Sequence, residues 1–165
     1  MTEAGISWTQ YHGYNNHVKY MECLASKYPG HVLVYNIGTS TEGRPLKLVK
    51  IGTSYEVNKK AIWIDGGIHA REWISPATTS YIMRELAENS GQYSSLLDKF
   101  DVYIMPSMNP DGYEYTRSYD RMWRKTRSRN PGYSCRGVDP NRNWGYNWGL
   151  KGASTNPCDG NYLSQ

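Results

Sequence analysis

The chain has 165 residues, enough for one domain or a large part of one, since domains most often have about 100–150 residues. With 21% charged residues, six Trp and fifteen Tyr, the composition excludes an intrinsically disordered chain. The net charge of +4 implies neither a nucleic-acid partner nor a membrane partner, and no apolar run approaches the roughly 20 residues of a membrane helix.

The first predicted element is an amphipathic helix near the N-terminus. Its apolar residues recur at steps of four and three and so share one face: Tyr14, Val18, Met21, Ala25 and Tyr28. The helix is expected to end at Pro29-Gly30. Two short strands rich in Val, Ile and Leu follow at 31–38 and 45–52, and Gly43 suits the hairpin loop between them.

A third and a fourth strand are predicted at 61–65 and at about 100–105. Both are apolar enough to be expected inside the sheet rather than at its edge. Between them, 75–91 begins with Ser-Pro and closes at Gly91, which predicts a helix and therefore a βαβ-like unit. The predicted fold class is α/β, with a mixed, largely buried β-sheet flanked by helices.

The character of the sequence changes after Pro106. Turn residues dominate in NPDG, NPGYSC, DPNRNWGYNWG and STNPCDGN, and periodicity is weak. About sixty residues without a strong element are too much loop for a compact domain, unless they form a binding surface or are covered by other structure. We therefore expect an incomplete fold.

Three cysteines cannot all pair within the chain. Cys135 and Cys158 lie in loop-like sequence, where a disulfide would join segments that lack a core, but spacing alone leaves this pairing open. Cys23 lies in the first predicted helix and is expected to be a buried free thiol.

The segment GGIHAREW, residues 66–73, is the first candidate site. It follows the strand at 61–65, and ligands of open α/β sheets bind beyond the carboxyl ends of strands. The paired glycines allow a sharp turn that presents His69 and Glu72 from one loop. An imidazole and a carboxylate are a suitable partial ligand set for Zn²⁺, whose catalytic sites commonly take three protein ligands. The alternative is a hydrogen-bonded loop histidine beside a carboxylate at a helix N-terminus.

The remaining histidines are His12, His17 and His31. None follows a strand end, so each is expected to be a surface or interface histidine and not a third zinc ligand.

A basic run at residues 121–129 contains Trp123 among five cations: Arg121, Arg124, Lys125, Arg127 and Arg129. Such a run is usually a solvated face, although interleaved aromatics also suit single-stranded nucleic acid. Downstream, Asn141 and Arg142 stand side by side, and an amide with a guanidinium can capture a carboxylate. By itself, DPNRNW favours a tight structural turn over a ligand site.

Five stretches together carry a family resemblance: AIWIDGGIHAREWISPA, NPDGY, WRKTRS, GVDPNRNW and GASTNPC. In this order and at these separations they resemble the zinc metallocarboxypeptidases of the pancreatic carboxypeptidase A and B type. The similarity extends over nearly the whole chain, so residues 1–165 are expected to form a single domain that is the N-terminal part of a catalytic domain.

The resemblance implies a role for each candidate residue. His69 and Glu72 would bind one zinc ion, and Arg127 would polarise the scissile carbonyl. Asn141 and Arg142 would hold the C-terminal carboxylate of a peptide, with Arg71 lining the next subsite. The reaction would be release of C-terminal amino acids through a zinc-activated water. The resemblance also implies a Cys135–Cys158 disulfide and hence a secreted, mature protein.

The chain departs from the family pattern at its end. The family's third zinc ligand, general base and specificity residue all lie downstream of Gln165, so the chain alone is not expected to be active. Two other readings remain: a non-catalytic module that captures peptide C-termini, and, ranked last, a nucleic-acid binder that uses residues 121–129.

Overall fold

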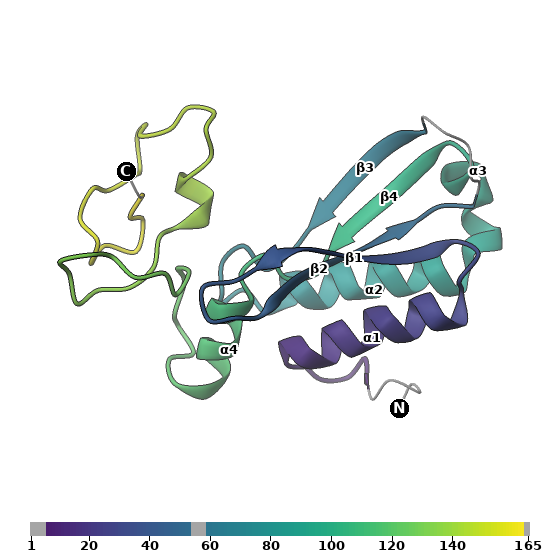
Figure 1. Ribbon diagram of the computed structural model, residues 1–165, viewed down its shortest axis with the longest axis horizontal. Coiled ribbons are helices and arrows are strands. Elements are labelled where there is room, and N and C mark those ends of the chain that lie inside the picture. Colours follow the sequence, from purple (N-terminus) through teal and green to yellow (C-terminus); the bar gives the residue numbers. More distant parts are fainter. Residues whose placement is uncertain (1–5, 54–58, 164–165) are drawn as a thin grey trace.

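A four-stranded mixed sheet forms the centre of the structure, in the order β1-β2-β4-β3 (Figure 1). The computed structural model describes residues 6–53 and 59–163. The strands are β1 (Val32–Thr39), β2 (Pro45–Ile51), β3 (Lys60–Asp65) and β4 (Phe100–Met105). Strand β2 pairs antiparallel with both β1 and β4, whereas β3 and β4 are parallel. The predicted α/β class with a mixed sheet is confirmed.

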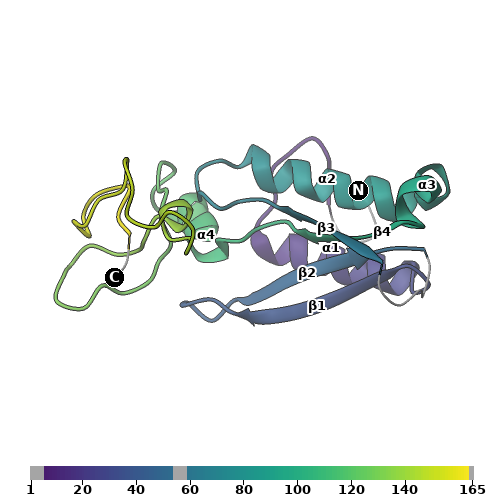
Figure 2. The same ribbon diagram turned by 90° about the horizontal axis from the view of Figure 1, so that it is seen from above.

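Two long helices, α1 (Tyr14–Lys27) and α2 (Ile74–Glu88), lie side by side against one face of this sheet (Figures 1 and 2). Helix α2 joins β3 to the parallel β4, which confirms the βαβ unit. The core between helices and sheet contains Met21, Leu24, Val49, Met83 and Ile104, all almost completely buried. In the described ranges no helix is long and apolar enough to cross a membrane.

The N-terminal predictions agree closely with the structure. Helix α1 and the β1–β2 hairpin occupy the expected segments, and Gly43 has a φ of 86° in the connecting loop, a conformation that favours glycine. The start of α2 differs, because the helix begins at Ile74 without a side-chain cap. The Ser75 hydroxyl accepts a hydrogen bond from the Gly67 amide instead, so it fixes the preceding loop. The helix also ends before Gly91, at Glu88.

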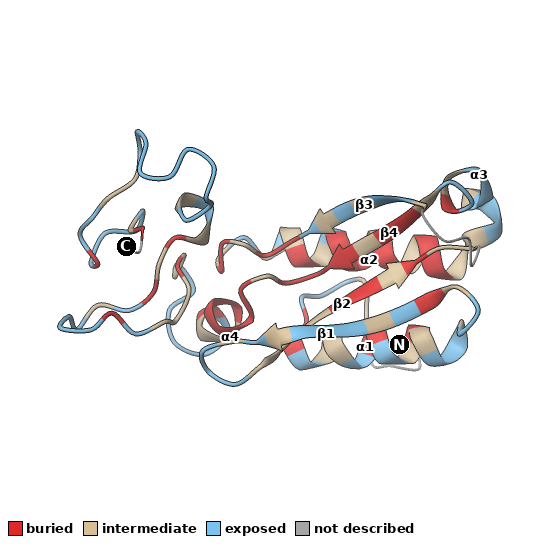
Figure 3. Ribbon diagram, turned by 45° about the horizontal axis from the view of Figure 1, so that its top comes forward, coloured by how far each residue is buried: buried red, intermediate tan, exposed pale blue. Residues whose placement is uncertain are grey.

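The position predicted for the third strand is wrong. Strand β3 is an edge strand, because β4 is its one partner among the described residues. Its side chains are exposed or half-buried, and Trp63 is 50% exposed (Figure 3). Strand β4 is in the interior as expected. Apolar composition indicates that a strand will be covered, but it does not determine the order of strands within a sheet.

Sequence analysis missed a helix in the segment after β4. Helix α4 (Pro110–Ser118) has Asn109 as its N-cap, whose side-chain oxygen accepts from the Gly112 amide at 3.0 Å, and Pro110 in the first turn. Beyond it, the described chain consists of loops, the short 3₁₀ helix η2 (Pro140–Arg142) and one isolated bridge, much of it exposed (Figure 3). The prediction of a loop-rich C-terminal third is thus confirmed only after α4.

The cysteine predictions are partly right. Cys135 and Cys158 form a disulfide, with their Cα atoms 5.1 Å apart, which joins two segments of the loop region. Cys23 is free, as expected, but it is half-buried rather than buried. Its position on α1 lies beside the face that packs on the sheet.

Two of the histidines expected at a surface or interface are in fact buried. His17 is 4% exposed and His12 is 8% exposed. His17 Nδ1 lies 2.9 Å from the Ser80 hydroxyl, so it packs between α1 and α2. Hydrophobic periodicity excluded His17 from the core because histidine is polar, yet this histidine lies on the buried face of α1. His31 is half-buried, and its Nε2 is 2.9 Å from the Ala87 carbonyl.

Candidate zinc and substrate site

The loop that follows β3 carries His69 and Glu72 and is fixed to the loop that follows β4. Gly66 and Gly67 accept hydrogen bonds from the Met108 and Asn109 amides, at 2.8 and 3.2 Å. A Cβ atom at Gly66 would lie 2.7 Å from the Thr79 hydroxyl, and Gly67 has a φ of 64°. The two glycines are therefore required for the tight turn at the carboxyl ends of the parallel strands.

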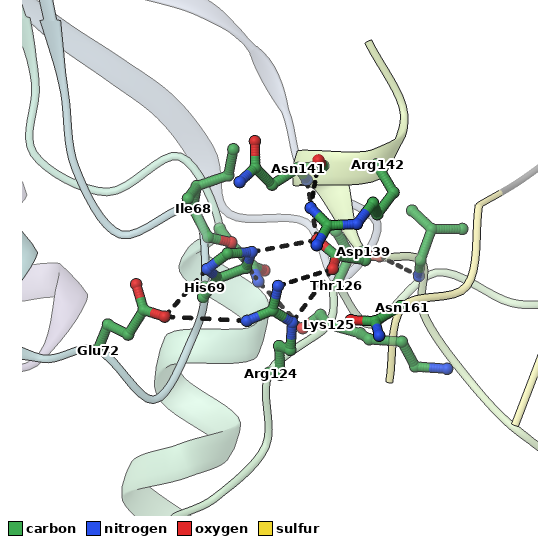
Figure 4. Close-up of polar contacts among 12 residues, drawn as sticks. Ile68, His69, Glu72, Arg124, Lys125, Thr126, Asp139, Asn141, Arg142 and Asn161 are labelled. Carbon is green, nitrogen blue, oxygen red and sulfur yellow. Dashed lines mark hydrogen bonds and ion pairs between the residues drawn. The ribbon is translucent and has the colours of Figure 1, made fainter. Parts of the chain in front are cut away.

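His69 lies between two carboxylates (Figure 4). Its Nδ1 atom is 3.0 Å from Glu72 Oε1, and its Nε2 atom is 3.1 Å from Asp139 Oδ1. Asp139 is completely buried and His69 is 7% exposed, whereas the Glu72 side chain is 48% exposed. His69 and Glu72 are thus in contact, as predicted from their spacing. Glu72 lies at the surface, and His69 connects it to the buried Asp139.

The contact with Asp139 suits one neutral tautomer of His69. In the tautomer whose Nε2 donates to the Asp139 carboxylate, the Nδ1 lone pair faces Glu72 Oε1. Two electron-pair donors that face each other require a proton or a cation between them. Tetrahedral zinc with ligand distances near 2.1 Å places its donor atoms about 3.4 Å apart. The 3.0 Å separation of His69 Nδ1 and Glu72 Oε1 is a hydrogen-bond distance, and a widening of about 0.4 Å would let the two atoms share a zinc ion.

Asp139 is a candidate site residue that sequence reasoning missed. Its Oδ1 also accepts from the Asn141 amide at 2.9 Å, and its Oδ2 accepts from Arg124 Nε and Nη2 at 3.1 and 2.9 Å. Asp139 caps η2, so the turn and the ligand-binding interpretations of DPNRNW are compatible. The available signal was an Asp before Pro in a turn motif, which marks a cap but does not reveal that the second oxygen contacts a histidine.

Arg127 is held by aromatic rings. Its guanidinium carbon lies 3.7 Å from the centre of the Tyr115 ring and 4.6 Å from that of Trp123. Its Nε is 3.6 Å from Glu42 Oε1 and makes no hydrogen bond within the described part of the chain. The guanidinium is thus fixed in position by the two rings, and its Nε is buried.

Asn141 and Arg142 lie at the other side of Asp139, in and just after the first turn of η2. Arg142 Nε donates to the Gly152 carbonyl at 3.1 Å, and its Nη1 donates to the Asn141 carbonyl at 3.0 Å. Its Nη2 makes no hydrogen bond that links it to another described residue. Both side chains line a hollow of about 310 Å³.

A second, larger hollow of about 760 Å³ contains the other two predicted substrate residues, Arg71 and Arg127. Arg124 lines this hollow and is 3.9 Å from Glu72 Oε1, so the hollow adjoins the ligand pair. The predicted residues thus fall into three groups. His69 and Glu72 form the candidate zinc-binding pair, called the metal pair below. Asn141 and Arg142 line the smaller hollow, and Arg71 and Arg127 line the larger one. No group of three potential metal-ligating side chains occurs in residues 6–53 and 59–163.

A comparison with protein families decides the classification. The sequence model of one protein family, described as zinc carboxypeptidase, matches residues 17–165. The chain belongs to the zinc carboxypeptidase family. This confirms the resemblance drawn from the five sequence motifs.

Individual zinc carboxypeptidases are similar in sequence and in structure. The chain is 47% identical to carboxypeptidase B of Astacus astacus over 95% of its own length and 52% of that protein. It is 45% identical to carboxypeptidase A2 of Mus musculus, covering 96% of the chain and 38% of the relative. The crystal structure of thrombin activatable fibrinolysis inhibitor superimposes with a TM-score of 0.91 at 40% identity, covering 98% and 42% of the two chains. The chain therefore spans about half or less of the length of these three proteins.

Proposed function

We propose that this chain provides the first half of a zinc metallocarboxypeptidase, which removes single amino acids from the C-termini of peptides and proteins. The observation that carries the proposal is the paired contact of His69 with Glu72 and Asp139, which leaves a nitrogen lone pair beside a carboxylate oxygen. Membership of the zinc carboxypeptidase family supports the same chemistry.

His69 and Glu72 would hold one zinc ion. When bound, zinc polarises a carbonyl as a Lewis acid and lowers the pKa of a water ligand from 15.7 toward about 7. Asp139 orients the His69 ring, and Arg124 balances the buried charge of Asp139. Arg127, which lines the larger hollow and stacks on Tyr115, would stabilise the negative charge that develops on the substrate carbonyl oxygen.

The hollow that contains Asn141 and Arg142 supports exopeptidase specificity. An amide donor and a guanidinium can bind both oxygens of a free α-carboxylate. A peptide held in this way would place its last peptide bond toward His69 and Glu72, because Asp139 contacts both His69 and the Asn141 amide. Arg71, in the larger hollow, would then contact the residues that precede that bond.

We further propose that residues 1–165 are the N-terminal part of one catalytic domain that needs further protein to be active. Two ligands bind zinc more weakly than three, and the chain offers no assigned general base. The open edge of β3 and the exposed Trp63 beside it are suited to pair with additional strands of the same domain. The additional part would supply a third ligand and a base.

A secreted location is part of the proposal. The Cys135–Cys158 disulfide supports it, because disulfides persist in oxidising compartments. The expected partners are peptides and proteins with a free C-terminal carboxylate, and neither a nucleic acid nor a membrane is among them.

The proposal is tested with the full-length protein and a matched pair of peptides, one with a free C-terminus and one amidated. We expect hydrolysis of the free acid, negligible hydrolysis of the amide, and loss of activity with a zinc chelator that is restored by added zinc. Binding of the free-acid peptide without any turnover, indifferent to the chelator, would instead favour the non-catalytic C-terminus-binding module. Cleavage of both peptides at equal rates would refute the exopeptidase assignment.

A further inference from the structure

The larger hollow beside the metal pair has an unbalanced charge. Five cations line it: Arg71, Arg124, Lys125, Arg127 and Arg136. Asp120 is the one carboxylate among the described lining residues, and its Oδ1 accepts a hydrogen bond from the Met122 amide. A concave surface with one sign of charge concentrates ligands of the opposite sign.

Three of these cations are already engaged by the protein. Arg124 forms an ion pair with the buried Asp139 at 2.9 Å. Arg127 stacks on Tyr115 and lies 3.6 Å from Glu42. Lys125 is 5% exposed and donates to the Pro157 carbonyl, and burial lowers its pKa. All three cations are therefore held in place by contacts within the protein.

Arg71 and Arg136 differ from the others. Within residues 6–53 and 59–163, no carboxylate lies within 4 Å of either guanidinium. Arg71 Nη1 makes one long contact, 3.4 Å, with the Met122 carbonyl, and Arg136 is exposed. Arg136 also borders a neighbouring hollow with Glu42, but that carboxylate is held by Arg44 at 2.8 Å. Two guanidinium groups therefore face the large hollow with their charge unsatisfied.

The position of the larger hollow indicates which part of a peptide substrate would enter it. The smaller hollow, with Asn141 and Arg142, lies on the Asp139 side of His69, and the larger hollow begins at Arg71 and Arg124 on the Glu72 side. A peptide with its C-terminal carboxylate at Arg142 would pass the metal pair and enter the larger hollow with its preceding residues. Three extended residues cover about 10 Å, so we consider the three residues before the C-terminal one as those that would lie in this hollow.

We propose that Arg71 and Arg136 form a cationic subsite that selects substrates with an acidic side chain among the three residues before the C-terminal one. The inference rests on the proposed function and extends it to substrate class. A guanidinium binds a carboxylate through two parallel hydrogen bonds, so Asp and Glu are preferred over their amides. Exposed ion pairs contribute about 0.2–1 kcal/mol each, so two of them together would favour an acidic residue by roughly two- to thirtyfold, with the middle of this range at roughly three- to tenfold.

The test uses the full-length protein and free-acid peptides that share one C-terminal residue and carry Glu, Gln or Lys at each of the three preceding positions. We expect kcat/KM for Glu to exceed that for Gln by roughly three- to tenfold at one position or more, with Lys the poorest. The Glu/Gln ratio should fall toward one in 1 M salt, where the Debye length is about 3 Å.

Two variants that each remove one positive charge distinguish the effect of the subsite from the effect of the overall charge of the protein. Arg136→Gln removes a cation of the hollow, whereas Arg129→Gln removes an exposed cation that does not line it. We expect Arg136→Gln to lower the Glu/Gln ratio and Arg129→Gln to preserve it. A Glu/Gln ratio of one at all three positions, or an equal fall of this ratio in both variants, overturns the inference. If the Gln peptides are still hydrolysed, the proposed function stands. Failure to cleave any free-acid peptide overturns both.

Discussion

The buried carboxylate of Asp139 lies 3.1 Å from Nε2 of His69, which leaves Nδ1 as the ring nitrogen that faces Glu72. Seventy residues separate the two side chains in sequence, and a third group, the Arg124 guanidinium, balances the charge of Asp139 at 2.9 Å. The metal pair therefore depends on the loop region as much as on the turn that carries it.

Replacing Asp139 by Asn should weaken zinc binding by about 10- to 100-fold, because the second partner of a metal-binding histidine sets its tautomer and basicity. Competition with a chromogenic chelator measures this in the full-length protein. Asp98→Asn removes an exposed carboxylate just before β4 and serves as the control. Equal zinc affinity of the Asp139 variant and the parent would show that the contact is only structural.

Arg142→Ala should lower kcat/KM for a free-acid peptide by about 10- to 100-fold while zinc content is retained, since a hydrogen bond to a charged group is worth about 1.5–3 kcal/mol. His69→Ala should have the opposite signature, with lost zinc as measured by mass spectrometry of the metal. A His69→Ala protein that keeps a full complement of zinc, or an Arg142→Ala protein with parental kinetics, would refute the respective assignment.

His17 should make the protein less stable in acid. Burial, with the nearby charges of His12 and Arg117, lowers its pKa from 6.5 to about 4. The neutral form is favoured in the folded state, so its stability contribution is complete above pH 6.5. It is lost as the pH falls from 6.5 toward 4, by about 1.4 kcal/mol per pH unit.

Urea denaturation at several pH values tests this. We compare Ser80→Ala with the double variant His17→Leu, Ser80→Ala, because the hydroxyl of Ser80 loses its partner when His17 is replaced. The double variant should show the shallower decrease between pH 6.5 and 4. Since both proteins keep the metal site, acid release of zinc does not contribute to the difference. Parallel pH profiles would show that His17 is not the group responsible.

Loss of the Cys135–Cys158 disulfide should free the loop region rather than unfold the sheet. Closure of a loop of this size, with a separation of 23 residues, is worth about 3 kcal/mol. A Cys135→Ala, Cys158→Ala variant should exchange backbone amides faster between residues 128 and 160, as measured by hydrogen exchange, with the strands β2 and β4 unchanged. Cys23→Ala is the control, and equal exchange in the loops of all three proteins would contradict the prediction.

Local patterns in the sequence were sufficient to predict the N-terminal fold. Helix α1, the hairpin around Gly43 and the β3–α2–β4 unit each follow from periodicity and turn residues. The edge position of β3 could not be predicted, because strand order depends on contacts between distant segments. Helix α4 was missed because its residues are polar and its stability comes from the Asn109 cap and from tertiary packing around Tyr113.

The sequence indicated individual residues of the candidate site, which stay predictions, but it did not indicate how they are arranged. The spacing of His69 and Glu72 indicated a shared ligand, and the structure places their donor atoms 3.0 Å apart. The contribution of Asp139 was not predictable, since nothing local links it to His69. Separation of Arg71 and Arg127 from Asn141 and Arg142 into two hollows likewise depends on the path of the loops.

The hydrogen bonds from Met108 and Asn109 to the glycines before His69 tie the two candidate ligands to the tertiary fold. The turn at His69 depends on β4 lying beside β3, and the orientation of the imidazole depends on the segment around Asp139. In a zinc finger, by contrast, the metal supplies the folding free energy. Here the geometry of the candidate ligands belongs to the fold itself, because contacts between protein groups hold both side chains.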